Sequence, residues 1–81
     1  MTESDFLKDP YGFNEIYLEL HGQNRLYIEN FKKLLKYTPI EIYIQSNQGS
    51  LLISGRNLYI KRYTSEELVI EGIIQNIFQL T

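Results

Sequence analysis

The chain has 81 residues, a formal net charge of −2 and no cysteine, so it suits one small domain without disulfides, thiolate metal sites or thiol catalysis. The near-neutral charge argues against nucleic acid bound by bulk electrostatics. No apolar run approaches the ~20 residues of a membrane-spanning helix, and residues 1–10 lack the basic start and apolar core of a secretory signal. We therefore expect a cytoplasmic protein with no direct membrane span.

The composition favours strands over helices. The sequence contains 7 Tyr and 4 Phe and is rich in Ile, whereas Ala is absent. Ala is the strongest helix former, while Ile and Tyr fit the pleated surface of a sheet. This bias argues against a helical bundle.

Taken in chain order, residues 1–10 predict a flexible N-terminal arm and residues 11–81 a single β domain. Apolar and polar residues then alternate with period two in short segments separated by turns such as 21–24, 46–49 and 54–57. This pattern predicts an antiparallel sandwich or roll of about seven to eight short strands. The predicted strands lie near 16–20, 25–29, 32–37, 40–45, 51–53, 58–60, 68–71 and 73–80.

Two segments also allow a helical interpretation. Three apolar residues between Phe31 and Leu35 lie at helical spacing, and Thr64 with Glu67 resembles a helix-capping box. Both segments are short and lie among strand patterns. We therefore favour a strand at 32–37.

Few residues suggest catalysis or metal binding. His21 is the only histidine and lies beside Gly22 in a predicted turn, whereas a metal site or a hydrolytic triad needs several converging groups. The adjacent carboxylates Glu66 and Glu67, with Glu71 further on, could form an acid–base pair, but a solvated acidic loop is the simpler interpretation. We predict no enzyme activity, no catalytic residue, no metal and no cofactor.

A small basic cluster leaves one alternative function open. Lys32, Lys33 and Lys36 lie beside the aromatic residues Phe31 and Tyr37, and such a combination can bind single-stranded nucleic acid in a small β-barrel. A nucleic-acid binder is usually more basic overall. We favour a solvated face for the lysines and keep the barrel as the second hypothesis.

The tyrosines provide the strongest candidate site. If the alternating aliphatic residues point inward, an outer face carries aromatic and aliphatic side chains of the kind enriched at protein interfaces. Either a partner protein covers this face, or the N-terminal residues Phe6, Tyr11 and Phe13 do. The predicted interface consists of Tyr17, Tyr27, Tyr43, Tyr59, Leu52 and Val69.

Strand edges offer a second route to assembly. The segments 40–45 and 51–54 favour strands and carry little charge. An uncovered edge at either segment could pair with a strand of another chain. We therefore expect a homo-oligomer or a complex with another protein.

Several segments together resemble the YabP/YqfC family of endospore-forming bacteria. Residues 26–30 resemble the first part of the family pattern, residues 49–60 its glycine-containing centre, and residues 66–73 with 77–78 its end. Each segment is a generic strand–turn pattern, and their order and spacing carry the resemblance. The length and the start of the chain are nearer the YqfC branch.

The resemblance implies a sporulation protein that works in the mother cell during assembly of the spore envelope, the coat and cortex. For the YqfC branch it implies a YqfD-like membrane protein as partner, which would place the chain at the membrane periphery. It supplies no catalytic residue. The biological setting thus comes from the resemblance alone, and the chemistry of the residues does not show it.

Overall fold

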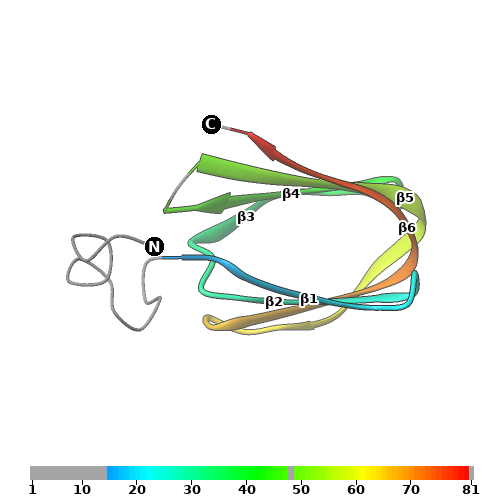
Figure 1. The fold of residues 1–81 in the computed structure, drawn as a ribbon, viewed down its shortest axis with the longest axis horizontal. Coiled ribbons are helices and arrows are strands. Elements are labelled where there is room, and N and C mark those ends of the chain that lie inside the picture. The colour runs from blue at the N-terminus through cyan, green and yellow to red at the C-terminus, as the bar shows by residue number, and fades with distance from the viewer. Residues whose placement is uncertain (1–14, 48, 81) are drawn as a thin grey trace, which may run out of the picture.

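The computed structural model describes residues 15–47 and 49–80, which form six antiparallel strands and no helix (Figure 1). The predicted N-terminal arm, residues 1–10, and the candidate covering residues Phe6, Tyr11 and Phe13 lie outside the described residues. The predicted all-β class is confirmed. The strands are β1 Tyr17–His21, β2 Arg25–Glu29, β3 Lys33–Tyr37, β4 Glu41–Ser46, β5 Gly49–Tyr63 and β6 Glu67–Leu80.

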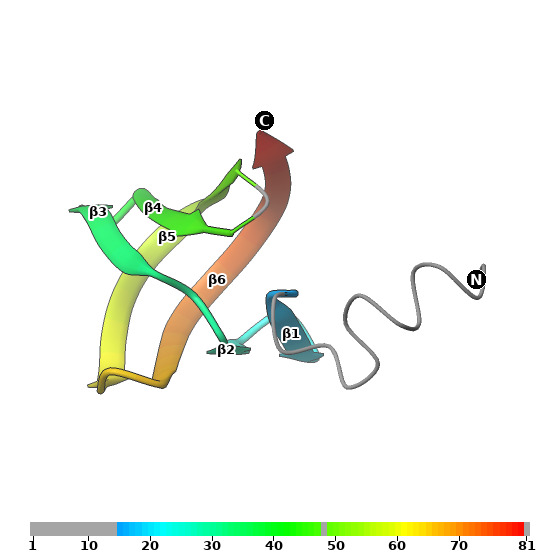
Figure 2. The same cartoon turned by 90° about the vertical axis from the view of Figure 1, so that its left-hand side faces the viewer.

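The strands form one sheet in the order β1-β2-β6-β5-β4-β3. β5 and β6 are much longer than the others, and both bend sharply near their middle (Figures 1 and 2). The bend folds the sheet over on itself. One layer contains β1, β2 and the adjoining parts of β5 and β6, and the other contains β3, β4 and the remaining parts of β5 and β6.

The predicted strand count was too high because two predicted breaks lie inside long strands. The segment 54–57, predicted as a turn, belongs to β5, and Gly72 belongs to β6. Irregular register near Gly55 and between Arg56 and Tyr59 marks the bend. Glycine here permits a bend within a strand, as β-bulges do, without ending the strand.

Two glycines allow the bent strands to lie close together. A Cβ atom added to Gly72, whose φ is +131°, would lie 2.5 Å from the Asn57 carbonyl oxygen. A Cβ atom added to Gly55 would lie 2.0 Å from the Ile73 carbonyl oxygen. Both distances are shorter than real Cβ contacts, so only glycine fits this approach of the two backbones.

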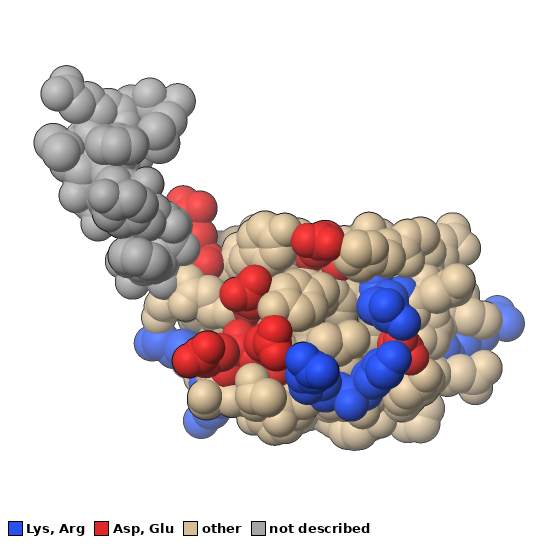
Figure 3. All heavy atoms as spheres, turned by 90° about the horizontal axis from the view of Figure 1, so that it is seen from below, with Lys and Arg blue, Asp and Glu red and all other residues tan. Residues whose placement is uncertain are grey.

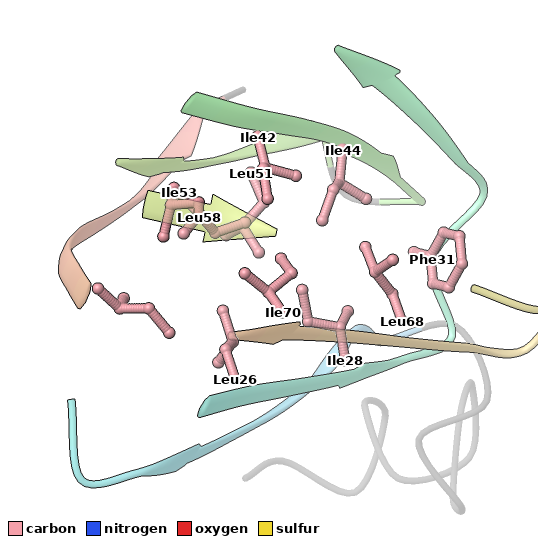
Figure 4. Close-up of a cluster of buried hydrophobic side chains, with 11 residues drawn as sticks. Leu26, Ile28, Phe31, Ile42, Ile44, Leu51, Ile53, Leu58, Leu68 and Ile70 are labelled. Carbon is pink, nitrogen blue, oxygen red and sulfur yellow. The ribbon is translucent and has the colours of Figure 1, made fainter. Parts of the chain in front are cut away.

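The core fills the space between the two layers. Aliphatic side chains of both layers point toward one another, as the alternation predicts (Figure 4). Burial of each such side chain contributes about 2 kcal/mol. The fully buried ones are Leu26, Ile28, Ile42, Ile44, Ile53, Leu68 and Ile70.

The two helical alternatives are not observed. Lys33–Tyr37 is a strand paired with β4, as favoured from the sequence, and a bulge lies between Leu34 and Lys36. The Thr64 hydroxyl accepts hydrogen bonds from the backbone N–H groups of Glu66 and Glu67, at 3.2 Å and 2.9 Å. The same side-chain chemistry that caps helices here closes the β5–β6 turn.

The predicted open edges at 40–45 and 51–54 were wrong. β4 pairs with β3 and β5, and β5 pairs with β4 and β6, so both segments are interior. The sheet ends instead at β1 and β3. Within residues 15–47 and 49–80, the structure contains no helix with the length and hydropathy to cross a membrane.

Candidate interaction surface

The tyrosines predicted to point outward do so. Register places Tyr27 opposite Val69 and Tyr43 opposite Leu52, while the residues on either side of them enter the core. All six predicted interface residues therefore lie on the outer face of the sheet. The structure does not bring them together, because the bend divides the outer face into two regions of different chemistry.

The first region is a tyrosine–glutamate network on the layer that contains β1 and β2. Three tyrosine hydroxyls each donate a hydrogen bond to a glutamate carboxylate. A phenol bonded to an ionised carboxylate forms a strong, charge-assisted hydrogen bond. The pairs are Tyr17 with Glu19, Tyr27 with Glu67, and Tyr59 with Glu71.

Cationic side chains complete this network. Arg25 approaches Glu71 at 2.7 Å and Lys61 approaches the same carboxylate at 3.5 Å, while Arg62 lies 3.2 Å from Glu67. Acidic and basic groups consequently lie side by side on this outer face, the acidic ones mostly on the left of the view and the basic ones toward the centre and right (Figure 3). They surround an open hollow of about 480 Å³, lined by Glu19, His21, Arg25, Tyr27, Lys61, Arg62 and Val69.

The hydrogen bonds shift the acidity of both partners. The bond to Glu67 raises the pKa of Tyr27 well above its usual 10.0, and the bond to Glu71 raises the pKa of Tyr59. Conversely, the bond from Tyr27, with help from Arg62, lowers the pKa of Glu67. The network thus stabilises neutral phenols and ionised carboxylates over the same pH range.

The tyrosines of the tyrosine–glutamate network already have hydrogen-bond partners within the chain. Tyr17, Tyr27 and Tyr59 use their hydroxyls within the chain, and the rings of Tyr17 and Tyr27 meet edge to face at 6.5 Å. A partner that displaced these bonds would have to replace charge-assisted interactions. This region is therefore a poorer docking surface than the tyrosine content alone suggests.

The second region is an apolar stripe on the opposite layer. Register places Tyr43 of β4 directly opposite Leu52 of β5, and Leu52 directly opposite Phe78 of β6. Leu35, at the β3 bulge, lines the same shallow hollow as Tyr43 and Leu52. We define the apolar stripe as Leu35, Tyr43, Leu52 and Phe78.

The stripe is accessible and apolar, and the Lys36–Glu41 ion pair borders it at the β3 end. Leu35 is 45% exposed and Phe78 is 48% exposed, whereas Tyr43 and Leu52 are half-buried between them. The Tyr43 hydroxyl accepts a hydrogen bond from the neutral Ser50 hydroxyl, at 3.3 Å. Contiguous apolar side chains on an outer sheet face are typical of protein interfaces.

The other sequence candidates do not form a second site. His21 pairs with Glu19 at 2.6 Å, and Lys36 pairs with Glu41 at 3.0 Å. Glu66 is exposed, whereas the neighbouring Glu67 belongs to the tyrosine–glutamate network. Over the described ranges, His, Asp and Glu side chains form no group of three that could hold a metal ion.

Two stripe residues were missed from the sequence. Phe78 lies in a run of residues without a clear alternation, because Gln75 is skipped in the β5–β6 pairing and shifts the phase. Leu35 was interpreted as part of a strand without an assigned face, and the β3 bulge decides its direction.

Comparison with known proteins supplies the family. Residues 14–78 match the YabP family. The chain is also similar to the uncharacterized protein YqfC of Bacillus subtilis (strain 168), with 40% identity over 53 residues. That alignment covers 65% of this chain and 57% of YqfC, so the chain spans little more than half the length of this relative.

The fold and its divided outer face define a small all-β domain built on one bent antiparallel sheet. The match over most of the chain then identifies the family. This chain belongs to the YabP/YqfC family, which is associated with sporulation. The resemblance seen in the sequence is thereby confirmed.

Proposed function

We propose that this protein is a non-enzymatic assembly component of the spore envelope, which binds other proteins through the apolar stripe. Its partners are a second copy of the chain, a YqfD-like membrane protein, or both. It works in the cytoplasm of the mother cell and reaches the membrane periphery through its partner. No cofactor, metal or nucleic acid takes part.

The stripe is the observation that carries this proposal. Leu52 lies between Tyr43 and Phe78 on three adjacent strands, so the three side chains form one continuous row. An exposed apolar row is unfavourable in water. A partner that covers the row removes its apolar area from water, which favours binding. Aromatic side chains in such a row are frequent hot spots of binding energy.

The contrast between the two regions supports the choice of the stripe. Tyr59 and Phe78 are each 48% exposed, but only Tyr59 has a carboxylate partner, Glu71. Charged and hydrogen-bonded groups are costly to desolvate, whereas Phe78 has no polar group to desolvate. Binding through the stripe is therefore favoured over binding through the tyrosine–glutamate network.

The experiment replaces the gene at its own locus with Phe78→Lys or with the control Tyr59→Lys. Both variants remove an equally exposed ring and add one positive charge, and Tyr59→Lys also removes the hydrogen bond to Glu71. We expect Phe78→Lys to weaken binding at least about tenfold, as loss of one hot spot does, and so to lower the yield of heat-resistant spores. Tyr59→Lys should stay close to wild type.

Immunoblotting must show equal amounts of both variants, and circular dichroism of the purified chains must show the same folded β signal. With those conditions met, a normal spore yield for Phe78→Lys would contradict the proposal. A defect confined to Tyr59→Lys would assign the function to the tyrosine–glutamate network instead.

A further inference from the structure

The C-terminal half of β6 is an open strand edge. β6 pairs with β5 as far as Leu80, but it pairs with β2 only through residues Glu67–Glu71. The N–H groups of Gly72 and Ile74 still donate to carbonyls of the β1–β2 turn, at 3.1 Å and 2.8 Å. Beyond Ile74, no strand among the described residues pairs with this side of β6, which leaves its backbone groups free for another strand.

The two ends of the sheet carry features that discourage pairing, whereas the β6 edge does not. β1 presents Glu19 and His21, and β3 presents Lys33 and Lys36 around a bulge. Charges and bulges are the usual protection of edge strands. Residues 72–80 contain no charge, no proline and no lysine.

The absence of charge extends one strand deeper into the sheet. Residues 49–55 of β5, which pair with this part of β6, are also uncharged. Two copies of this edge can therefore meet without repulsion between like charges, whereas two β3 edges would bring their lysines together. The exposed amides of Gln75, Asn76 and Gln79 each donate and accept hydrogen bonds, so the edge is chemically complementary to itself.

We propose that two copies of this chain pair antiparallel along residues 76–80 of β6, around a two-fold axis at Phe78. The inference deepens the proposed function by naming the surface of self-association, and its register rests on the geometry of the edge. Pairing of identical edges around a two-fold axis closes the assembly as a dimer.

The register follows from the direction of the side chains. Phe78 lies opposite Leu52 on the outer face, whereas Ile77 lies opposite the fully buried Ile53 on the inner face. Directly opposed residues in an antiparallel sheet point to the same face. One residue at the axis must therefore lie opposite the same residue of the second copy. The whole segment 76–80 can pair only if that residue is Phe78.

This register joins the apolar stripes of the two copies. Phe78 of one copy would lie opposite Phe78 of the other, an aromatic pair of the kind that stabilises adjacent strands. The row Tyr43, Leu52, Phe78 would then continue directly into the same row of the second copy. The dimer would present one stripe of twice the length on its outer face.

The test uses single cysteines, which report cleanly because the chain has none. Opposed residues in an antiparallel pair have Cα atoms about 4.5–5.5 Å apart, which suits a disulfide. Under mild oxidation, Phe78→Cys should form a disulfide-linked dimer at least about tenfold faster than Tyr59→Cys, which starts from equal exposure. Gln79→Cys, opposed to Ile77 in this register, should cross-link more slowly than Phe78→Cys.

Light scattering during size-exclusion chromatography gives the second readout. We expect a concentration-dependent dimer whose dissociation constant rises about tenfold in Asn76→Lys/Gln79→Lys, because each copy then brings two positive charges to the shared edge and the added charges at position 79 lie diagonally across from each other. The control Ser65→Lys adds a positive charge in the exposed β5–β6 turn, away from this edge, and should leave the dimer unchanged.

Three results would overturn the inference. These are a strict monomer, equal cross-linking at positions 59 and 78, and faster cross-linking at position 79 than at position 78. A strict monomer would show that this edge does not pair with a second copy. None of these results bears on the spore yield of Phe78→Lys, so the dimer and the proposed function fail separately.

Discussion

The Tyr27 hydroxyl donates a hydrogen bond to the carboxylate of Glu67, which is 40 residues further along the chain. β2 and β6 are adjacent in the sheet, and Tyr27 lies opposite Val69, two residues after Glu67. Arg62 approaches the same carboxylate. Tyr27, which the sequence placed in a candidate interface, thus uses its hydroxyl within its own chain. The apolar stripe is therefore the stronger candidate interface.

The Tyr27–Glu67 bond predicts a measurable change in acidity. Removal of the hydroxyl in Tyr27→Phe should raise the pKa of Glu67 toward its ordinary 4.5, because this bond is the largest cause of its lowering. Titration of the glutamate carboxyl resonances by NMR measures the shift. Tyr43→Phe, which lies in the apolar stripe, serves as the control and should leave Glu67 unchanged, and an unshifted Glu67 in Tyr27→Phe would refute the pairing.

The same carboxylates predict acid sensitivity. The pKa values of Glu19, Glu67 and Glu71 are lowered in the folded chain, so below about pH 4.5 the unfolded chain binds more protons. The free energy of unfolding is therefore at its full value above that pH and decreases as the pH falls through the lowered pKa values. Urea titrations at several pH values measure this decrease.

A matched variant separates this effect from general acid denaturation. Glu67→Gln/Glu71→Gln lacks two of the carboxylates, so its stability should depend less steeply on pH below about 4.5. Parallel pH profiles for this variant and the wild type would show that the network does not contribute.

The sheet bend predicts a large difference between two glycines. Gly72→Ala should lower the free energy of unfolding by about 3 kcal/mol, because its Cβ would collide with the Asn57 carbonyl group at a positive φ. Gly22→Ala also has a positive φ but meets no atom within 4 Å, so its cost should be only about 1 kcal/mol. Thermal unfolding followed by circular dichroism compares the two, and equal costs would show that close approach does not define the bend.

Local sequence patterns predicted the strands well but made no prediction of their order. Period-two alternation identified the core residues of β2 and β4, and the turns at 21–24 and 46–49 lie where the sequence places them. The insertion of β6 between β2 and β5 depends on contacts distant in sequence. No local pattern encodes it, and the predicted open edges were wrong for that reason.

Glycine was the most misleading signal. Gly55 and Gly72 resembled turn residues, but each lies inside a long strand where a side chain would meet the backbone of the neighbouring strand. A turn and a close approach of two strands require the same absence of Cβ, so the sequence alone does not distinguish them.

The outward direction of the tyrosines could be predicted from the sequence, but their hydrogen-bond partners could not. Alternation placed Tyr27, Tyr43 and Tyr59 on the outer face correctly. Which tyrosines have glutamate partners depends on register between strands far apart in the chain, and the outward direction of Phe78 depends on the irregularity at Gln75. The division into two regions is therefore a property of the folded sheet.

The most direct test of the account is site-specific photocross-linking in sporulating cells, with p-benzoylphenylalanine placed at position 78 or at position 59. Both positions are equally exposed, but only position 78 lies in the apolar stripe. The account predicts discrete cross-linked products from position 78, containing either a second copy or a membrane protein, and few from position 59. Products from position 59 with none from position 78 would contradict it.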